Sequence, residues 1–287
     1  MNYYKPATFD EAIAIASGAE GITRILAGGT DVLVQMRSDI VTPDTLIDIK
    51  AIDGVKDITR AEDGGWTIGV AVCGAEISEH PDLPREWPGV VEAIGLIGST
   101  QVQGRATPVG NLCNASPAAD SVPALVAAGA EVTVQGPNGP RRVAVEDIPT
   151  GPGRTSLQKG EIITALHLPP RGKGGGDAYQ RFIPRTEMDI AVVGCGVNLR
   201  VSGQVITEAR MALGAVAPTV ERVRGAADAL VGTKLEDSAL DALADLAQAA
   251  CNPIDDKRGT VKFRTHLAGV YARRVAKIAY ERARAAQ

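Results

Sequence analysis

The sequence GSTQVQGRATPVGNLCNASPAAD, residues 98–120, is the basis for interpreting the rest of this 287-residue chain. It combines glycines with small side chains and short polar groups and has almost no bulk. Gly98, Gly104 and Gly110 allow backbone conformations and close contacts that a β-carbon would forbid, and amides that face open space suit a phosphate. A long surface loop between two elements has the same composition. The stretch therefore predicts either a phosphate cradle or a surface loop.

A second glycine segment lies upstream, where AGGTDVLVQMR occupies residues 27–37. The preceding ITRILA is typical of a short buried strand, and DVLVQMRSD predicts a helix or a helical turn. A strand, a glycine turn and a helix start leave unpaired amides at the helix N-terminus, which favours an anion. An ordinary strand-to-helix turn has the same pattern, so this motif alone does not identify a binding site.

Composition and charge exclude several classes of protein. Hydrophobic residues make up 45% of the chain and charged residues 22%, which is typical of a globular protein with one large or two modest domains. The net charge of -4 argues against nucleic acid as the main partner, because binding to a phosphate backbone needs a basic face. No apolar run approaches the roughly 18 residues of a membrane span. Since MNYYKP also lacks the apolar core of a signal peptide, we expect a cytoplasmic protein.

The residues that usually carry catalysis or bind metals form no convincing constellation. Cys73, Cys113, Cys195 and Cys251 are widely spaced, so we expect free thiols and neither a zinc site nor an iron-sulfur cluster. The histidines lie in different segments and form no zinc-protease motif. GCG at residues 194–196 lies inside a predicted strand and lacks the third glycine of a dinucleotide-binding fingerprint. We therefore expect no catalytic residue and no metal ligand in this chain.

Local patterns predict an alternating α/β part that is followed by strands and then by helices. Thr8 and Glu11 form a capping box, which predicts that the first helix starts there. RGKGGGD at residues 171–177 has three consecutive glycines and no apolar anchor, so we place a linker and the domain boundary there. In the last predicted helix, apolar side chains recur at helical spacing and are expected to face the core: Leu267, Val270, Tyr271, Val275 and Ile278.

Several motifs, taken together and in one order, resemble a known family. They are AGGTDVLVQMR at residues 27–37, ATPVGNLCNASPAAD at 106–120, GPGRTSLQKGEI at 151–162, RTEMDIAVVG at 185–194 and GAVAPT at 214–219. This set is similar to the FAD-carrying medium subunits of molybdenum hydroxylases, a family that includes the flavoprotein of carbon monoxide dehydrogenase and the FAD domain of xanthine dehydrogenase. The resemblance covers nearly the whole chain, and several motifs in one order are far more specific than any one of them.

The resemblance implies an α+β fold with two domains. Residues 1–174 would form a two-part FAD-binding domain of the vanillyl-alcohol-oxidase/PCMH type. Residues 178–287 would form a smaller C-terminal domain of the carbon monoxide dehydrogenase flavoprotein type, with a three-stranded antiparallel sheet and helices.

The same resemblance implies which residues bind FAD. The first segment would wrap the FAD pyrophosphate through its backbone amides and consists of Ile25, Leu26, Ala27, Gly28, Gly29, Thr30, Asp31, Val32 and Leu33. The second phosphate-facing loop consists of Thr107, Pro108, Val109, Gly110 and Asn111. Asp120 matches an acidic position that contacts the adenosine, and Ile97 matches a position packed on the adenine side. Ile163 falls near a backbone contact in the following strand.

Two positions depart from the family pattern, and a further loop lies beside the ring system. The second loop usually has paired glycines, whereas Val109 precedes Gly110 here, which leaves open whether residue 109 approaches the cofactor directly. Arg181 stands where some relatives carry a lysine near the flavin, which keeps the charge but not the shape. Asp189 and Ile190 match a loop beside the isoalloxazine ring, where an apolar residue can control access. For Ile190 alone, a buried strand start is an equally good interpretation.

The resemblance also implies noncovalent FAD and a role in electron transfer. In the family, a large molybdopterin-binding subunit oxidises the substrate, a small subunit with [2Fe-2S] clusters passes the electrons to FAD, and FAD delivers them to an external acceptor. Molybdopterin and clusters would therefore be present only in partner subunits, and the complex would be a dimer of heterotrimers. Two alternatives stay open. One is an independent flavin-dependent oxidoreductase, which needs its own substrate pocket with a general base, and the other is a binding or scaffold protein that has lost FAD.

Overall fold

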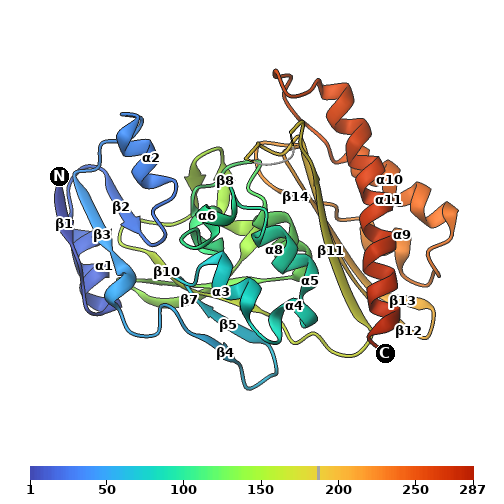
Figure 1. The fold of residues 1–287 in the computed structure, drawn as a ribbon, viewed down its shortest axis with the longest axis horizontal. Coiled ribbons are helices and arrows are strands. Elements are labelled where there is room, and N and C mark those ends of the chain that lie inside the picture. Colours follow the sequence, from blue (N-terminus) through green and yellow to red (C-terminus); the bar gives the residue numbers. More distant parts are fainter. Residues whose placement is uncertain (186–187) are drawn as a thin grey trace.

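The computed structural model describes residues 1–185 and 188–287. Figure 1 shows an N-terminal part (residues 1–51) at the left, a central part (residues 52–170), and a C-terminal part (residues 171–287) at the right. One cluster of buried apolar side chains fills mainly the N-terminal and central parts, and a second cluster fills the C-terminal part. The chain thus has a mixed α and β architecture with two cores.

The N-terminal part is a small parallel sheet with two helices. Its elements are β1 (Asn2–Tyr4), α1 (Phe9–Gly18), β2 (Thr23–Leu26), α2 (Val32–Arg37), β3 (Thr45–Asp48) and the 3-10 turn η1 (Ile49–Ala51). All residues of β3 are buried, as expected for the strand that lies between β1 and β2. The Thr8 hydroxyl accepts a hydrogen bond from the Glu11 amide at 3.2 Å. The predicted start of the first helix is therefore confirmed.

The central part contains a five-stranded antiparallel sheet. Its strands are β4 (Ile58–Arg60), β5 (Trp66–Gly69), β6 (Glu131–Gly136), β7 (Gly139–Ala144) and β10 (Ile162–Leu168). Strand β10 lies in the middle, between β5 and β6, and buries Ile162, Ile163, Leu166 and Leu168. A bulge between Ile163 and Ala165 interrupts the pairing with β6, and a bulge of this kind changes the direction of neighbouring side chains.

Short helices pack beside the central sheet (Figure 1). They are α3 (Gly74–Glu79), α4 (Leu83–Glu86), α5 (Pro88–Ile94), α6 (Thr100–Gln103), α7 (Pro108–Cys113), α8 (Ser121–Ala128) and η2 (Val145–Asp147), which is followed by the hairpin of β8 (Pro149–Gly151) and β9 (Arg154–Thr155). Residues 98–120 are thus a pair of short helices joined by turns, not an extended loop. The Thr107 hydroxyl accepts from the Gly110 amide at 2.9 Å, and Pro108 occupies the first helical position, so both residues favour a helix start.

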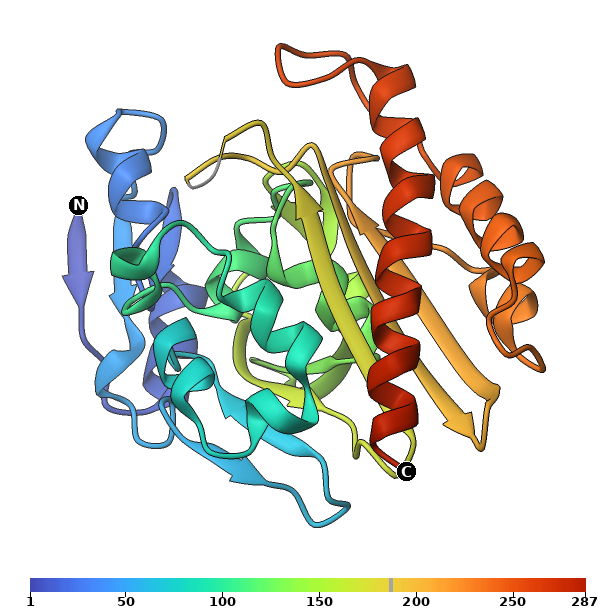
Figure 2. The same cartoon turned by 45° about the vertical axis from the view of Figure 1, so that its right-hand side comes forward.

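The C-terminal part is an antiparallel sheet with helices on one side, and Figure 2 shows the longest helix lying along the sheet. Its elements are β11 (Gly175–Phe182), β12 (Val193–Ser202), β13 (Val205–Gly214), β14 (Glu221–Arg222), α9 (Ala226–Leu230), α10 (Asp237–Ala249) and α11 (Val261–Ala285). The sheet has four strands, so the expected three-stranded sheet is wrong by one short strand. Because β14 has only two residues, it shows no alternation that a sequence pattern could reveal.

Alternation along β12 lets the C-terminal sheet pack on both faces. Cys195 and Val197 belong to the C-terminal core, whereas Gly194 and Gly196 face the opposite side. A β-carbon added at Gly196 would lie 2.7 Å from the carbonyl oxygen of Pro123 in α8. The GCG sequence therefore allows α8 of the central part to approach the sheet closely. Burial raises the pKa of the Cys195 thiol above its usual range.

The expected linker at residues 171–177 is packed structure and not a free connection. Gly175 already pairs in β11, and the Arg171 guanidinium carbon lies 4.1 Å from the ring centre of Trp87. A β-carbon added at Gly176 would lie 2.2 Å from the Ala279 carbonyl oxygen in α11. The glycines here permit close helix packing, which composition cannot distinguish from flexibility.

Polar contacts from the C-terminal part also complete a helix of the central part. Asp177 is 3% exposed, and its Oδ2 accepts a hydrogen bond from the Val90 amide in the first turn of α5 at 2.9 Å. The other carboxylate oxygen forms an ion pair with Arg171 at 2.8 Å. Arg282 of α11 forms an ion pair with Glu92 of α5. The two cores are thus joined by directed polar contacts across their boundary.

Candidate functional site

A cleft of about 510 Å³ lies between β2, α2, α7 and the start of β10. Strand β2 ends in the first glycine segment, and α7 carries the second, so both segments reach this cleft. The structure brings together most of the residues that the resemblance assigns to FAD. Those that line the cleft are Ile25, Ala27, Gly28, Gly29, Thr30, Asp31, Val32, Ile97, Thr107, Val109, Gly110, Asn111 and Ile163.

The two glycine segments supply open backbone amides to the cleft. Within residues 1–185 and 188–287, the amides of residues 28–32, Thr107 and Val109 donate to no protein acceptor. The amides of Gly110 and Asn111 are instead used by Thr107, through its hydroxyl and its carbonyl oxygen. Unpaired amides that gather at an open cleft suit the oxygens of a phosphate. This donor set fits the pyrophosphate of FAD.

Contacts between the two segments fix them as one cradle. A β-carbon added at Gly28 would lie 2.0 Å from the Arg105 carbonyl oxygen, so only glycine permits this approach. The Arg105 Nε in turn donates to the Gly28 carbonyl oxygen at 3.1 Å. Asn114 donates to Asp31 at 3.3 Å and accepts from Gln35 at 3.1 Å, and burial raises the pKa of the Asp31 carboxyl. Both halves of the cradle therefore depend on each other.

At two positions of the cradle, Gly29 and Val109, the β-carbon direction points into the protein and not into the cleft. At Gly29 the backbone has φ +80°, and an added β-carbon would lie 2.9 Å from Leu26 Cδ1 and 3.1 Å from Leu33 Cδ1. Leu26 and Leu33 themselves do not line the cleft, and neither does Pro108. Val109 is 3% exposed and belongs to the main core, so little of its side chain reaches the cleft. The valine that replaces a family glycine is therefore accommodated in the core.

Asp120 and Arg181 lie together, outside the residues that line the cleft. The Arg181 Nη1 lies 2.6 Å from Asp120 Oδ2, and the Tyr179 hydroxyl donates to Asp120 Oδ1 at 3.3 Å. This cluster joins the start of α8 to β11. Burial raises the pKa of Asp120 to about 6, although the Arg181 charge opposes the shift. Both carboxylate oxygens of Asp120 thus have protein partners.

Asp189 and Ile190 lie on the connection between β11 and β12, outside the residues that line the cleft. Ile190 is 51% exposed and β12 begins at Val193, so a buried strand start is the wrong interpretation for Ile190. The Asp189 carboxylate lies 3.2 Å from Arg185 Nε, and this hydrogen bond lowers the pKa of Asp189. Residues 186–187 of the RTEMDIAVVG motif lie outside the described residues.

Several residues of the cleft were not predicted as site residues. Gly153, Thr155 and Leu157, in and after the β8–β9 hairpin, form part of its lining. A signal existed, because GPGRTSLQKGEI at residues 151–162 is one of the motifs of the family resemblance. Cys113 and Asn114 also line the cleft, and burial raises the pKa of the Cys113 thiol to about 12.

His167 makes structural contacts with two neighbouring strands. His167 lies between the hydroxyls of Thr67, at 3.1 Å, and Thr133, at 2.8 Å, and burial lowers its pKa to about 4. In the described residues, no group of three or more His, Cys, Asp or Glu side chains could hold a metal ion. No helix within residues 1–185 and 188–287 is both long enough and apolar enough to cross a membrane.

Comparisons with known proteins agree with the geometry of the cleft. Residues 1–171 match the family described as FAD binding domain in molybdopterin dehydrogenase, and residues 178–279 match the CO dehydrogenase flavoprotein C-terminal domain. The carbon monoxide dehydrogenase medium chain of Hydrogenophaga pseudoflava is 32% identical over 98% of both chains. The xanthine dehydrogenase FAD-binding subunit of Escherichia coli O157:H7 is 31% identical over 96% of this chain and 94% of its own length.

Solved structures show the same fold. A chain of carbon monoxide dehydrogenase from Hydrogenophaga pseudoflava superposes with a TM-score of 0.94 at 31% identity and covers 98% of both chains. A chain of quinoline 2-oxidoreductase from Pseudomonas putida 86 superposes with a TM-score of 0.89 at 25% identity, over 99% of this chain and 98% of its own length. The chain therefore belongs to the family of FAD-binding medium subunits of molybdenum hydroxylases.

Proposed function

We propose that this chain is the FAD-carrying electron-transfer subunit of a molybdenum hydroxylase complex. It binds FAD noncovalently, receives electrons from [2Fe-2S] clusters of a small partner subunit, and passes them to an external acceptor. A large molybdopterin-binding subunit carries out the oxidation of the organic substrate. The assembly is a dimer of heterotrimers in the cytoplasm.

The observation that carries this proposal is the row of open amides along the cleft. The amides of residues 28–32 and of Val109 would bind the pyrophosphate, and Ile97 would offer apolar surface to the adenine end. Ile163 would lie near a backbone contact to the cofactor. FAD, when bound, supplies the redox chemistry, and the protein supplies position and electrostatics. Asp189 and Ile190 would lie beside the isoalloxazine ring, and Asp120, which is paired with Arg181, would contact the adenosine part of FAD.

The architecture that we propose has two domains. Residues 1–174 form a FAD-binding domain of the vanillyl-alcohol-oxidase/PCMH type, and residues 178–287 form the C-terminal domain. The separation of the buried side chains into two main clusters supports this division. The division also assigns the cleft to the first domain, because its lining residues run from Thr23 to Ile163.

Release of the cofactor tests the binding mode. After acid precipitation of the yellow protein, we expect FAD in the supernatant, because no lining side chain offers a reactive attachment point. Cys113 is the lining thiol, and its raised pKa keeps it protonated. Flavin that remains in the pellet would contradict noncovalent binding, and FMN in the supernatant would contradict the pyrophosphate site.

Turnover experiments test the relay. We expect that the singly purified, FAD-loaded chain accepts electrons from an artificial reductant but oxidises no substrate of the complex. Adding the molybdopterin and [2Fe-2S] subunits should restore substrate-dependent reduction. Substrate oxidation by the metal-free, isolated chain would favour an independent flavin-dependent oxidoreductase instead.

A further inference from the structure

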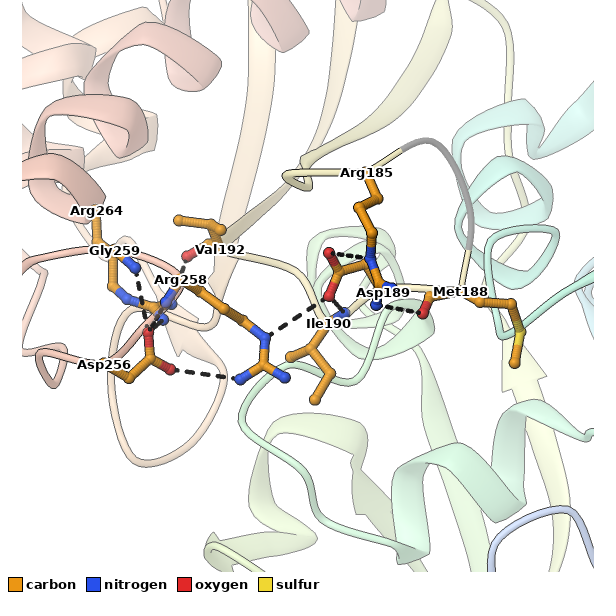
Figure 3. A network of polar contacts seen from close by, with 9 residues as sticks. All are labelled: Arg185, Met188, Asp189, Ile190, Val192, Asp256, Arg258, Gly259 and Arg264. Carbon is orange, nitrogen blue, oxygen red and sulfur yellow. Dashed lines mark hydrogen bonds and ion pairs between the residues drawn. The ribbon is translucent and has the colours of Figure 1, made fainter.

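Ile190 is an exposed apolar residue, and residues close to it in the chain are contacted by arginines of another segment. Asp189 precedes it, and the Asp189 Oδ1 lies 3.7 Å from Arg258 Nε (Figure 3). Val192 follows it, and the Val192 carbonyl oxygen accepts a hydrogen bond from Arg264 Nη1 at 2.8 Å. The loop between β11 and β12 is therefore held on both sides of Ile190, by the segment that leads into α11 and by the first turn of α11 itself.

Arg264 is the fixed end of this arrangement. It lies in the first turn of α11 and is 4% exposed. Its Nη1 also donates to the Ala215 carbonyl oxygen at 3.2 Å, and its Nη2 forms an ion pair with Asp256 Oδ1 at 2.8 Å. A buried guanidinium is costly to leave without its partners, so this residue holds Asp256 and Val192 firmly.

Asp256 contacts both Arg264 and Arg258 and so links the two arginines. Its Oδ1 accepts hydrogen bonds from the Arg258 amide at 2.8 Å and from the Gly259 amide at 3.2 Å, and its Oδ2 lies 3.7 Å from Arg258 Nη1. Burial alone would raise the pKa of Asp256, but these amides and Arg264 hold it below its ordinary value. Arg258 is therefore oriented through both its backbone and its side chain.

Burial gives little support to Met188 and Ile190 themselves, although Ala191 and Val192, which follow them in the loop, are buried. Ile190 is 51% exposed and Met188 is 58% exposed, so neither side chain is anchored in a core. The Arg185 contact to Asp189 is local, because the two residues are four positions apart. Among the described residues, Arg258 is the partner that ties Asp189 to a distant segment of the chain.

We propose that Asp256, Arg258 and Arg264 form a clamp that positions Ile190 against the isoalloxazine ring, with Arg258 as the positioning residue. The inference rests on the proposed function, in which Asp189 and Ile190 lie beside that ring. An exposed apolar side chain on a loop fixed by ion pairs suits contact with a flat aromatic ligand. The C-terminal part would thus shape the surroundings of a cofactor whose phosphates are bound by the N-terminal and central parts.

The test compares Arg258→Gln with a matched control, Arg273→Gln. Arg273 is also an arginine of the C-terminal part that contacts two carboxylates, Asp237 at 3.7 Å and Asp241, and its side chain is 33% exposed against 26% for Arg258. Amide hydrogen exchange of residues 188–192 is measured in the FAD-free full chain. We expect about two- to fivefold faster exchange in Arg258→Gln, the ratio that follows from the loss of one long, partly exposed ion pair, and no change in the control.

The second measurement uses the FAD-loaded full chain. Visible circular dichroism reports the asymmetry around the bound flavin, and we expect it to change in Arg258→Gln and to stay unchanged in Arg273→Gln. The FAD dissociation constant should change less than about twofold, because the phosphate cradle does not include Arg258. Asp256→Asn keeps the shape of the side chain and weakens the same clamp, so it serves as a second variant if Arg258→Gln folds poorly.

Hydrogen exchange, the flavin spectrum and FAD binding each test a different part of the proposed clamp. Unchanged exchange at residues 188–192 would show that the clamp does not hold the loop. Faster exchange with an unchanged flavin spectrum would show that Ile190 does not contact the ring, while FAD binding itself would stand. If the unaltered chain bound no FAD, the proposed function would fail, and the inference would fail with it.

Discussion

Val109 provides a direct test of how the cradle is built, because it replaces a glycine of the family pattern. Val109 is 3% exposed and belongs to the main core, while its amide is open. Val109→Gly removes a buried side chain, which costs about 1.5 to 3 kcal/mol, and places glycine in a helix, which costs about 1 kcal/mol more. We therefore expect a loss of about 2.5 to 4 kcal/mol in the free energy of unfolding.

The same substitution should leave FAD affinity nearly unchanged. The amide of residue 109 and the open amides of residues 28–32 stay in place, so the dissociation constant should change by less than about threefold. For a chain of this size, the expected loss of stability corresponds to a melting temperature that is lower by about 5 to 16 °C. Val109→Ala is the control, because it shortens the side chain without adding glycine to α7.

Both quantities are measured on one preparation, by thermal melting of the FAD-free chain and by FAD titration. The contrary result would be a Val109→Gly variant that binds FAD about tenfold more tightly and melts at the unaltered temperature. That result would mean that the valine side chain obstructs the cofactor and does not contribute to the core.

Two further predictions follow from the glycines and from Asp120. Gly29→Ala should melt at a lower temperature than Gly153→Ala. Both positions have positive φ, which costs about 1 to 2 kcal/mol for alanine, but only the added β-carbon of residue 29 meets a close neighbour, Leu26 Cδ1 at 2.9 Å. Equal melting of the two FAD-free variants would show that Leu26 moves aside. Asp120→Asn tests the pKa of about 6, which burial raises from 3.8. The folded state holds the Asp120 proton more tightly than the unfolded state, so Asp120 adds stability at low pH, and this contribution is lost as pH rises through 6. The loss in the free energy of unfolding caused by Asp120→Asn should therefore shrink by up to roughly 3 kcal/mol between pH 4 and 7. Urea unfolding of both proteins checks this, and a penalty that grows with pH would show that the Arg181 charge outweighs burial.

Local patterns predicted the parts of the fold that are set by near neighbours. The Thr8 cap and the strand-turn-helix at residues 23–37 were found where expected. In α11, Tyr271 and Val275 face the C-terminal core as the helical spacing predicted. These features depend on residues that are three or four positions apart in the chain, and a sequence shows such relations directly.

Features that depend on distant contacts could not be predicted from the sequence. The glycines of residues 171–177 have the composition of a linker, and only the approach of α11 explains Gly176. Arg181 and Asp120 lie 61 positions apart in the chain, and no pattern indicates that they form a buried pair. The β8–β9 hairpin differs, because its motif at residues 151–162 was part of the family resemblance, and only its position in the cleft depends on how the chain folds back.

The hydrogen bond from the Val90 amide to Asp177 has a consequence for biosynthesis. The ribosome delivers Pro88–Ile94 well before residue 177, so α5 leaves the exit tunnel with an open first turn. Its amide finds its carboxylate only when β11 has been made. We therefore expect the central part to complete its folding only after residue 177 has been synthesised, because α5 lacks the Asp177 contact and Trp87 lacks the Arg171 contact until then.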